Sequence, residues 1–124
     1  MSVMNSEKQT VNRVSEEVVS VIAARATLGI PGVNRLSETI ADNLTKKISG
    51  KDHATKGIKI FKEDGGIGMD IYINVDYETK IPDLAWNVQS SVKKTVEKVT
   101  GLTVKHVNIH VLGVTLPKRK TQEG

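Results

Sequence analysis

Two histidines near the end of the chain are the side chains whose type and spacing first suggest chemistry. In the segment HVNIH, His106 and His110 share one side of a predicted strand with Asn108. Residues four apart in a strand are separated by about 13 Å, because each residue advances the chain by about 3.3 Å. One metal ion cannot bridge that distance within a chain, although histidines of two subunits could share one. We therefore expect histidines on a sheet surface and no metal site.

Acidic residues on another predicted strand raise the question of acid–base catalysis. Asp70, Asn74 and Asp76 share one side of this strand, and Asp70 is about 20 Å from Asp76 along its axis. No nucleophile stands beside a base and an orienting group in the sequence. The chain also has no cysteine, which excludes thiolate catalysis and cysteine-based zinc sites. We expect no enzymatic activity, no catalytic residue and no cofactor.

The segment GGIG, residues 65–68, matches the G-x-x-G pattern with which KH domains clamp a nucleic-acid backbone. In KH domains that loop joins two helices, whereas here it lies between two predicted strands. A turn at Asp64-Gly65-Gly66 explains the same glycines as ordinary hairpin chemistry. The chain has one tryptophan, two tyrosines and one phenylalanine, which leaves bases little to stack on. The segment therefore indicates a hairpin.

Lysines on one predicted helix offer an alternative site for nucleic acid. Lys93, Lys94 and Lys98 oppose the apolar stripe of that helix, and the formal net charge of the chain is +4. A second group of cations stands near the end of the chain: Lys118, Arg119 and Lys120. RNA bound by these cations would be released as salt rises, because phosphate contacts displace counterions. A lysine-rich face is more often the solvated side of a helix, so RNA binding is the alternative function.

Apolar periodicity predicts three helices that position these residues. VSEEVVSVIAARATLG predicts a helix that is capped by Ser15 and ended by a left-handed Gly29. The residues expected on its buried face are Val18, Ile22 and Ala26, with Val21 and Leu28 widening it. A second helix is predicted over residues 36–50, after the short extended segment IPGVNR. The third runs from Pro82 to Gly101, and its stripe consists of Leu84, Val88, Val92, Val96 and Val99.

Alternation predicts two long strands as well as the strand that precedes the hairpin turn. After the turn, the side expected to face the core carries Ile67, Met69, Ile71, Ile73, Val75 and Tyr77. The opposite side carries Gly68, Asp70, Tyr72, Asn74 and Asp76. In the last strand, LTVKHVNIHVLGV, the inward residues are Val107, Ile109 and Val111. Val104 is out of phase with them, which indicates a β-bulge near Lys105.

This order of elements predicts a single α+β domain of two layers. A mostly antiparallel sheet would carry the amphipathic helices on one face. We place the domain at residues 14–114, between a flexible segment at 1–13 and a basic flexible tail at 115–124. The N-terminus lacks the apolar core of a signal peptide, and the longest apolar run is far short of the ~20 residues of a membrane span. The pattern favours a cytoplasmic protein with no span of its own.

Several short blocks carry a family resemblance: Pro31-Gly32, Ile81-Pro82, Val88-Gln89, Thr100-Gly101-Leu102 and residues 107–114. From about Val14 to Val114, the sequence resembles the alkaline shock protein family of Gram-positive bacteria, also called general stress or envelope stress response proteins. The resemblance implies a cytoplasmic, non-enzymatic protein induced by envelope or alkaline stress. It also implies a small membrane-anchoring partner for some members and self-association for others. Some paralogues are linked to fatty-acid metabolism, so the process stays open.

The residues and the resemblance agree on a candidate protein-interaction surface, which we call the polar face. It consists of Asp70, Tyr72, Asn74, Asp76, His106, Asn108 and His110. Alternation leaves this broad side of the sheet, and the backbone edges of the sheet, without an assigned partner. We expect a scaffold or adaptor that contacts a membrane-protein partner, or another copy of itself, at the inner side of the membrane.

Overall fold

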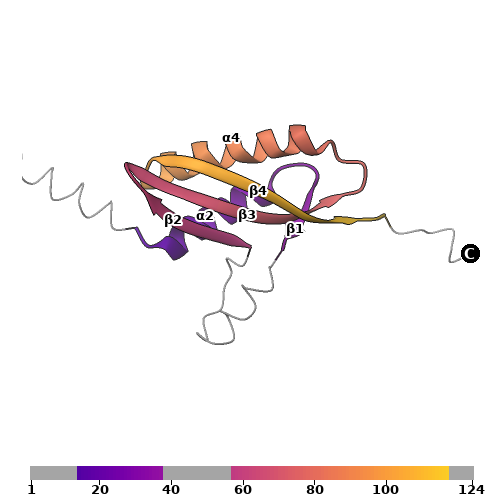
Figure 1. Cartoon of the computed structure of the whole chain (residues 1–124), viewed down its shortest axis with the longest axis horizontal. Helices are drawn as coiled ribbons and strands as arrows, with labels where there is room; N and C mark the ends of the chain where they lie inside the picture. The colour runs from indigo at the N-terminus through magenta and orange to yellow at the C-terminus, as the bar shows by residue number, and fades with distance from the viewer. Residues whose placement is uncertain (1–13, 38–56, 118–124) are drawn as a thin grey trace, which may run out of the picture.

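The structure is a computed structural model, and it describes residues 14–37 and 57–117. Its elements, in order, are α2 (Glu16–Leu28), β1 (Val33–Leu36), β2 (Ile58–Glu63), β3 (Gly66–Asp76), α4 (Ile81–Thr100) and β4 (Val104–Thr115) (Figure 1). Over these residues the predicted order is confirmed. The helix predicted over 36–50 lies outside the described residues except for its first two positions, of which Leu36 instead ends β1. The termini at 1–13 and 118–124 also lie outside them.

Strand β3 is the centre of the sheet. β2 pairs antiparallel with residues 66–71 of β3, and β1 pairs antiparallel with residues 73–75, so both lie along the same edge of β3. β4 pairs with the other edge and runs parallel to β3, as a crossover through α4 permits. The described residues thus form a four-stranded, mostly antiparallel sheet with β4 at its margin (Figure 1).

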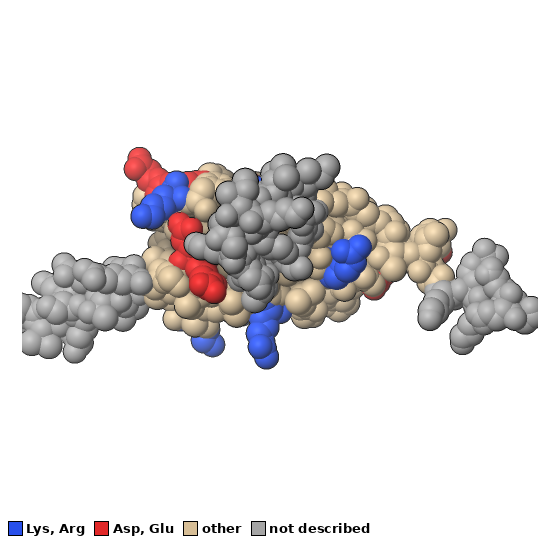
Figure 2. All heavy atoms as spheres, turned by 90° about the horizontal axis from the view of Figure 1, so that it is seen from below, with Lys and Arg blue, Asp and Glu red and all other residues tan. Residues whose placement is uncertain are grey.

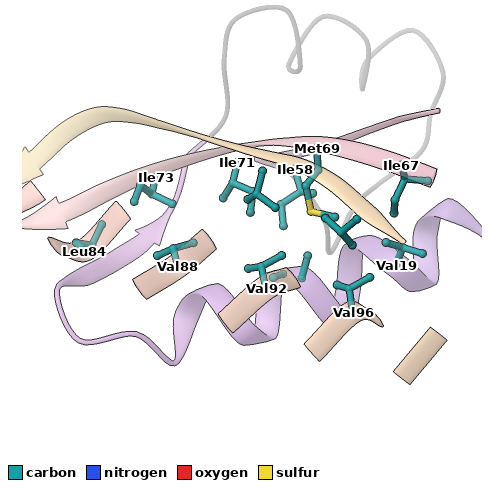
Figure 3. Packing of buried hydrophobic residues seen from close by; sticks show 14 of the residues in the cluster. Val19, Ile58, Ile67, Met69, Ile71, Ile73, Leu84, Val88, Val92 and Val96 are labelled. Carbon is teal, nitrogen blue, oxygen red and sulfur yellow. The ribbon is translucent and has the colours of Figure 1, made fainter. Parts of the chain in front are cut away.

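The core lies between this sheet and the two helices, which cover the same face (Figure 3). Met69, Ile71 and Ile73 of β3 are fully buried and point toward α4. On α4 the buried residues are Leu84, Val88, Val92, Val96 and Thr100. The predicted α+β class and its two-layer arrangement are therefore confirmed.

One apolar residue of α4 and one that follows β3 were predicted to face the core but lie outside it. Val99 is 61% exposed, because the stripe of α4 advances in steps of four and reaches Thr100 instead. The Thr100 hydroxyl donates to the carbonyl of Val96 at 2.7 Å, which satisfies it inside the core. Tyr77 is half-exposed, because β3 ends one residue earlier at Asp76.

Helix α2 buries a face that only partly overlaps the predicted one, because the predicted Ile22 and Ala26 are half-buried and pack against the core. Its buried residues are Val19, Ser20, Ala23, Ala24 and Thr27. Val18, Val21 and Leu28, which we expected inside, are 42–49% exposed. The observed face is rich in small side chains, which let the helix come close to the rest of the domain at native packing density. The predicted cap is confirmed, since the Ser15 hydroxyl accepts the N–H of Val18 at 3.2 Å.

The predicted ends of the two helices are confirmed at three positions and wrong at one. Pro82 lies in the first turn of α4, and Gly101 ends that helix in the left-handed conformation with φ 80°. Gly29 closes α2 with φ −82°, which is right-handed. Gly29 thus ends the helix as predicted but not in the predicted conformation, and the glycine with positive φ in the following turn is Gly32, with φ 101°.

Strand β4 contains two β-bulges. Ile67 pairs with Val104 and Gly68 with His106, so Lys105 is the extra residue, as predicted. A second register shift follows, because Ile73 pairs with Val111 and Asn74 with Gly113. This shift leaves Leu112 as an extra residue that alternation did not indicate. Each bulge breaks the regular ladder and increases the local twist of the strand.

Candidate functional site

The seven residues of the polar face lie on two neighbouring strands. β3 carries Asp70, Tyr72, Asn74 and Asp76, and β4 carries His106, Asn108 and His110. The parallel register sets Asp70 opposite Asn108 and Tyr72 opposite His110. Because the alternate residues of β3 are buried against the helices, these side chains project from the opposite side of the sheet. The structure therefore brings the predicted face together on one surface.

Asp70 organises the middle of the polar face. Its Oδ1 accepts a hydrogen bond from Asn108 Nδ2 at 2.9 Å and lies 3.2 Å from His110 Nε2. The ring of Tyr72 stacks on the ring of His110, with centroids 4.5 Å apart and planes inclined by 14°. One carboxylate and one aromatic ring of β3 thus hold two side chains of β4 in fixed orientations.

A contact across three strands continues the face toward β2. Glu63 places its two carboxylate oxygens 2.8 and 2.9 Å from His106 Nδ1. This pair spans β3 at Gly68, where an added Cβ would lie 2.5 Å from both Glu63 Oε2 and Phe61 Cε2. Sequence reasoning missed Glu63 and Phe61, and the available signal was a glycine inside an otherwise regular strand.

The other end of the face is tied to β1. Asn74 accepts a hydrogen bond from Ser37 Oγ at 3.0 Å and donates to Thr115 Oγ1 at 3.3 Å. Asp76 Oδ1 accepts from Asn34 Nδ2 at 2.9 Å. Sequence reasoning missed Asn34, Ser37 and Thr115, because their proximity depends on which strands are neighbours.

The arrangement presents ordered hydrogen-bonding groups to its surroundings. The side chains of the two histidine–carboxylate pairs remain partly exposed, so they stay accessible. Across the described residues, no cluster of three or more histidine, cysteine or acidic side chains could hold a metal ion. Chemically, the face is suited to recognition by preordered donors and acceptors.

The glycines of the GGIG segment serve the hairpin, as predicted. Gly65 lies in the turn with φ 83°, a conformation that L-residues rarely adopt. Gly66 and Gly68 are already part of β3. The segment therefore does not join two helices as the KH loop does.

The lysines of α4 do not share one environment. Lys93 Nζ donates to the carbonyl of Val104 at 2.9 Å and to Glu97 Oε2 at 3.0 Å, so it is held against β4. Lys94 and Lys98 are exposed. Figure 2 views the molecule from below, with α4 on the far side, and most of the acidic side chains visible there gather toward one end while the basic ones stand apart from one another. The cations at 118–120 lie outside the described residues.

Glu97 links α4 to the start of β4. The Val104 N–H donates to Glu97 Oε2 at 2.8 Å. This backbone hydrogen bond, followed by that from Lys93, lowers the pKa of Glu97 from its usual value, although burial opposes the shift. A carboxylate whose pKa is lowered by folding stabilises the fold above the pKa of the unfolded chain. The contribution disappears as the pH falls through the lower pKa of the folded state.

We expect Glu97→Gln to lower the free energy of unfolding at neutral pH by about 1 kcal/mol, because a charged acceptor is lost. The figure is modest since 34% of the Glu97 side chain is exposed and solvent screens the charge. Over the pH range below the usual glutamate pKa value of 4.5, the wild type should lose more stability than the variant. Urea unfolding across this range measures both, and parallel pH profiles would contradict the prediction.

Neither of the two described helices is long and apolar enough to cross a membrane.

Comparison with known proteins places these observations in a family. The model of the alkaline shock protein 23 family, which is described as having a cell envelope-related function, matches residues 4–116. The protein YloU of Bacillus subtilis (strain 168) is 39% identical over 103 residues, which cover 82% of this chain and 85% of YloU. Spy1535 of Streptococcus pyogenes serotype M6 is 34% identical over 107 residues, which cover 85% of this chain and 79% of that protein. A solved structure of a MamM-CTD variant has a TM-score of 0.48 at 15% identity, covering 80% of this chain and 99% of that one.

Proposed function

This chain belongs to the alkaline shock protein 23 family, which has a cell envelope-related function, and from that membership we propose that it is a non-enzymatic scaffold or adaptor. It acts through protein–protein contacts at the cytoplasmic side of the membrane. A small membrane-protein partner holds it there, and copies of the chain associate with one another. The polar face is the contact surface.

The single observation that supports this function best is the order of the polar face. Asp70 holds Asn108 and His110, and Tyr72 stacks on His110, before any partner is bound. Side chains that are already fixed lose little conformational entropy on binding, so more of each contact contributes to affinity. A sheet face held in this way suits a partner that reads a fixed pattern of donors and acceptors.

We expect Asp70→Lys to weaken association with the partner by at least about tenfold. The variant removes the acceptor of Asn108 and His110 and places a cation among them. Asp76→Lys, which removes the acceptor of Asn34, should act in the same direction. Glu17→Lys is the matched control, because it makes the same charge change on an exposed residue of α2. Association that is unchanged in both face variants would contradict the proposal.

The partner is identified in the cells that make the protein. The tagged chain is gently crosslinked and purified with and without nuclease treatment, and the retained proteins are identified. A small membrane protein that survives nuclease, and that is lost in Asp70→Lys but kept in Glu17→Lys, supports the adaptor function. Loss of every partner on nuclease treatment would contradict it.

RNA binding through Lys93, Lys94, Lys98 and the basic tail is the alternative function, and the geometry favours it less. Lys93 already donates to Val104 and Glu97, so using it for RNA would break contacts inside the domain.

A further inference from the structure

The outer margin of β4 exposes part of its backbone. Backbone groups in a strand point alternately to its two sides. On β3, the Tyr72 N–H donates to Gly57 and the Tyr72 carbonyl accepts from Ser37, both on the side away from β4. Ile71 and Ile73 therefore direct their backbone groups toward β4.

The same alternation decides which groups of β4 point outward. Asn108 and His110 flank the position opposite Ile71 and bond to β3. Val107, Ile109 and Val111 consequently direct their N–H and carbonyl groups away from the sheet. The Val107 carbonyl confirms this direction, because it accepts a hydrogen bond from Gln89 Nε2 of α4 at 2.9 Å.

Side chains of α4 close the first half of this margin. Lys93 Nζ donates to the Val104 carbonyl at 2.9 Å, and Glu97 Oε2 accepts from the Val104 N–H at 2.8 Å. Together with the hydrogen bond from Gln89 to the Val107 carbonyl, these contacts occupy the outward N–H and carbonyl of Val104 and the outward carbonyl of Val107. Covering an edge with side chains prevents another strand from pairing there.

The second half of the margin is open. Within residues 14–37 and 57–117, no hydrogen bond reaches the outward N–H and carbonyl groups of Ile109 or Val111. On α4 the residue one turn before Gln89, on the same side of the helix, is Trp86, which is 67% exposed. An indole thus stands where the next capping side chain would be. Leu112 and Val114, farther along β4, are also half-exposed.

The closed half carries a depression of about 280 Å³ that is bordered by Lys93, Lys105 and His106. Lys93 is paired with Glu97 and His106 with Glu63, so among the described residues Lys105 is the bordering cation without a carboxylate partner. Lys105 is the bulge residue, about 13 Å along the strand from Ile109. A partner strand that pairs with Ile109 and Val111 would place its own residues, a few positions farther along, beside this depression. Acidic side chains at those positions would complement the charge of Lys105.

We propose that the margin of β4 receives an extended acidic peptide of a partner protein, which adds to the sheet as a further strand. Its apolar residues lie beside Trp86 and Leu112, its backbone pairs with Ile109 and Val111, and its acidic residues reach Lys105. Main-chain pairing supplies affinity and the flanking side chains supply specificity, as in other cases of strand addition. This inference rests on the proposed adaptor function but assigns the margin of β4, which meets the polar face at His106 and Asn108.

A synthetic eight-residue peptide is the probe, with valine at alternate positions of one half and glutamate at alternate positions of the other. It is titrated into the full chain labelled with ¹⁵N. We expect the amide signals of Ile109 and Val111 to shift and their hydrogen exchange to slow. Trp86 is the chain's one tryptophan, so a blue shift of protein fluorescence reports its burial directly.

Three variants separate the parts of the site. Trp86→Ala should weaken peptide binding by at least about tenfold, because a buried tryptophan commonly dominates an interface. Lys105→Glu should weaken binding of the glutamate peptide and strengthen binding of a peptide with lysine in place of glutamate. Val99→Ala, an exposed apolar residue elsewhere on α4, is the matched control and should leave binding unchanged.

Several outcomes would overturn the inference. One is the absence of any shift at Ile109, Val111 and Trp86 with millimolar peptide. A second is the same shifts with an oligouridylate RNA, and a third is the same protection on raising the protein concentration alone, which would mean that a second copy fills the margin. If peptide binding fails while Asp70→Lys still abolishes partner association, the edge site is wrong and the proposed function stands. If the peptide binds while Asp70→Lys leaves association unchanged, the edge site stands and the polar face is wrong.

Discussion

Replacing Gly66 by alanine is expected to lower the free energy of unfolding by about 3 kcal/mol. An added Cβ would overlap the carbonyl oxygen of Thr103. That oxygen belongs to the backbone and accepts the N–H of Ile67 at 2.9 Å, so rotating a side chain cannot relieve the overlap. The start of β4 would have to move away from β3, which disturbs the pairing on which the polar face depends.

The control is an alanine at Gly29. An added Cβ there meets its nearest atom, the carbonyl oxygen of Ala26, at 3.6 Å, and φ is −82°. Alanine fits this conformation and restricts the unfolded chain, so Gly29→Ala should raise stability by about 0.5 kcal/mol. Urea unfolding followed by circular dichroism measures both variants. A Gly66→Ala protein as stable as the wild type would show that β3 and β4 do not approach as described.

Replacing Leu84 by alanine is expected to remove about 3 kcal/mol from the free energy of unfolding. Leu84 is 2% exposed, in the first turns of α4 where the helix meets the end of the sheet. Its Cδ1 also lies so close to Gly32 that an added Cβ there would be 2.8 Å away. Truncation therefore opens a cavity that the tight turn beside it cannot collapse to fill.

Leu28→Ala makes the same chemical change on α2, where the side chain is half-exposed. We expect it to alter stability by no more than about 0.5 kcal/mol. Equal losses for the two leucine variants would show that α2 buries the face that periodicity predicts rather than the observed one. Thermal unfolding of both proteins under identical conditions decides between these faces.

Periodicity predicts an element well where apolar residues occupy one side of it. In β3, alternation separates buried Met69 and Ile71 from polar residues that are half-buried or exposed, and the prediction is confirmed. Around α2, valine, isoleucine and alanine are distributed on nearly every side, so spacing cannot choose a face. In the structure, the side of α2 that packs against the domain carries the small residues Ala23 and Ala24, and the larger Val18 and Val21 lie outside it, because small side chains allow a closer approach.

The membership of the polar face was predictable, but its bonds were not. Alternation places Asp70 and Asn108 on exposed sides of their strands, whichever direction the strands run. The 2.9 Å bond between them exists because β4 runs parallel to β3 in one particular register. The contact between Glu63 and His106 depends further on three strands meeting at Gly68. Pairings between distant segments carry little local signal, because the hydrophobic pattern alone does not specify neighbours.

The parallel pairing of β3 with β4 has a consequence for synthesis on the ribosome. β4 is the last of the described elements to be translated, and it contributes His106, Asn108 and His110 to the polar face. A nascent chain that ends before β4 therefore has β3 without its parallel neighbour and lacks three of the seven residues of the polar face. Domains generally fold as units once their last contacts are available. The polar face is therefore complete only after the whole of β4 has been synthesised.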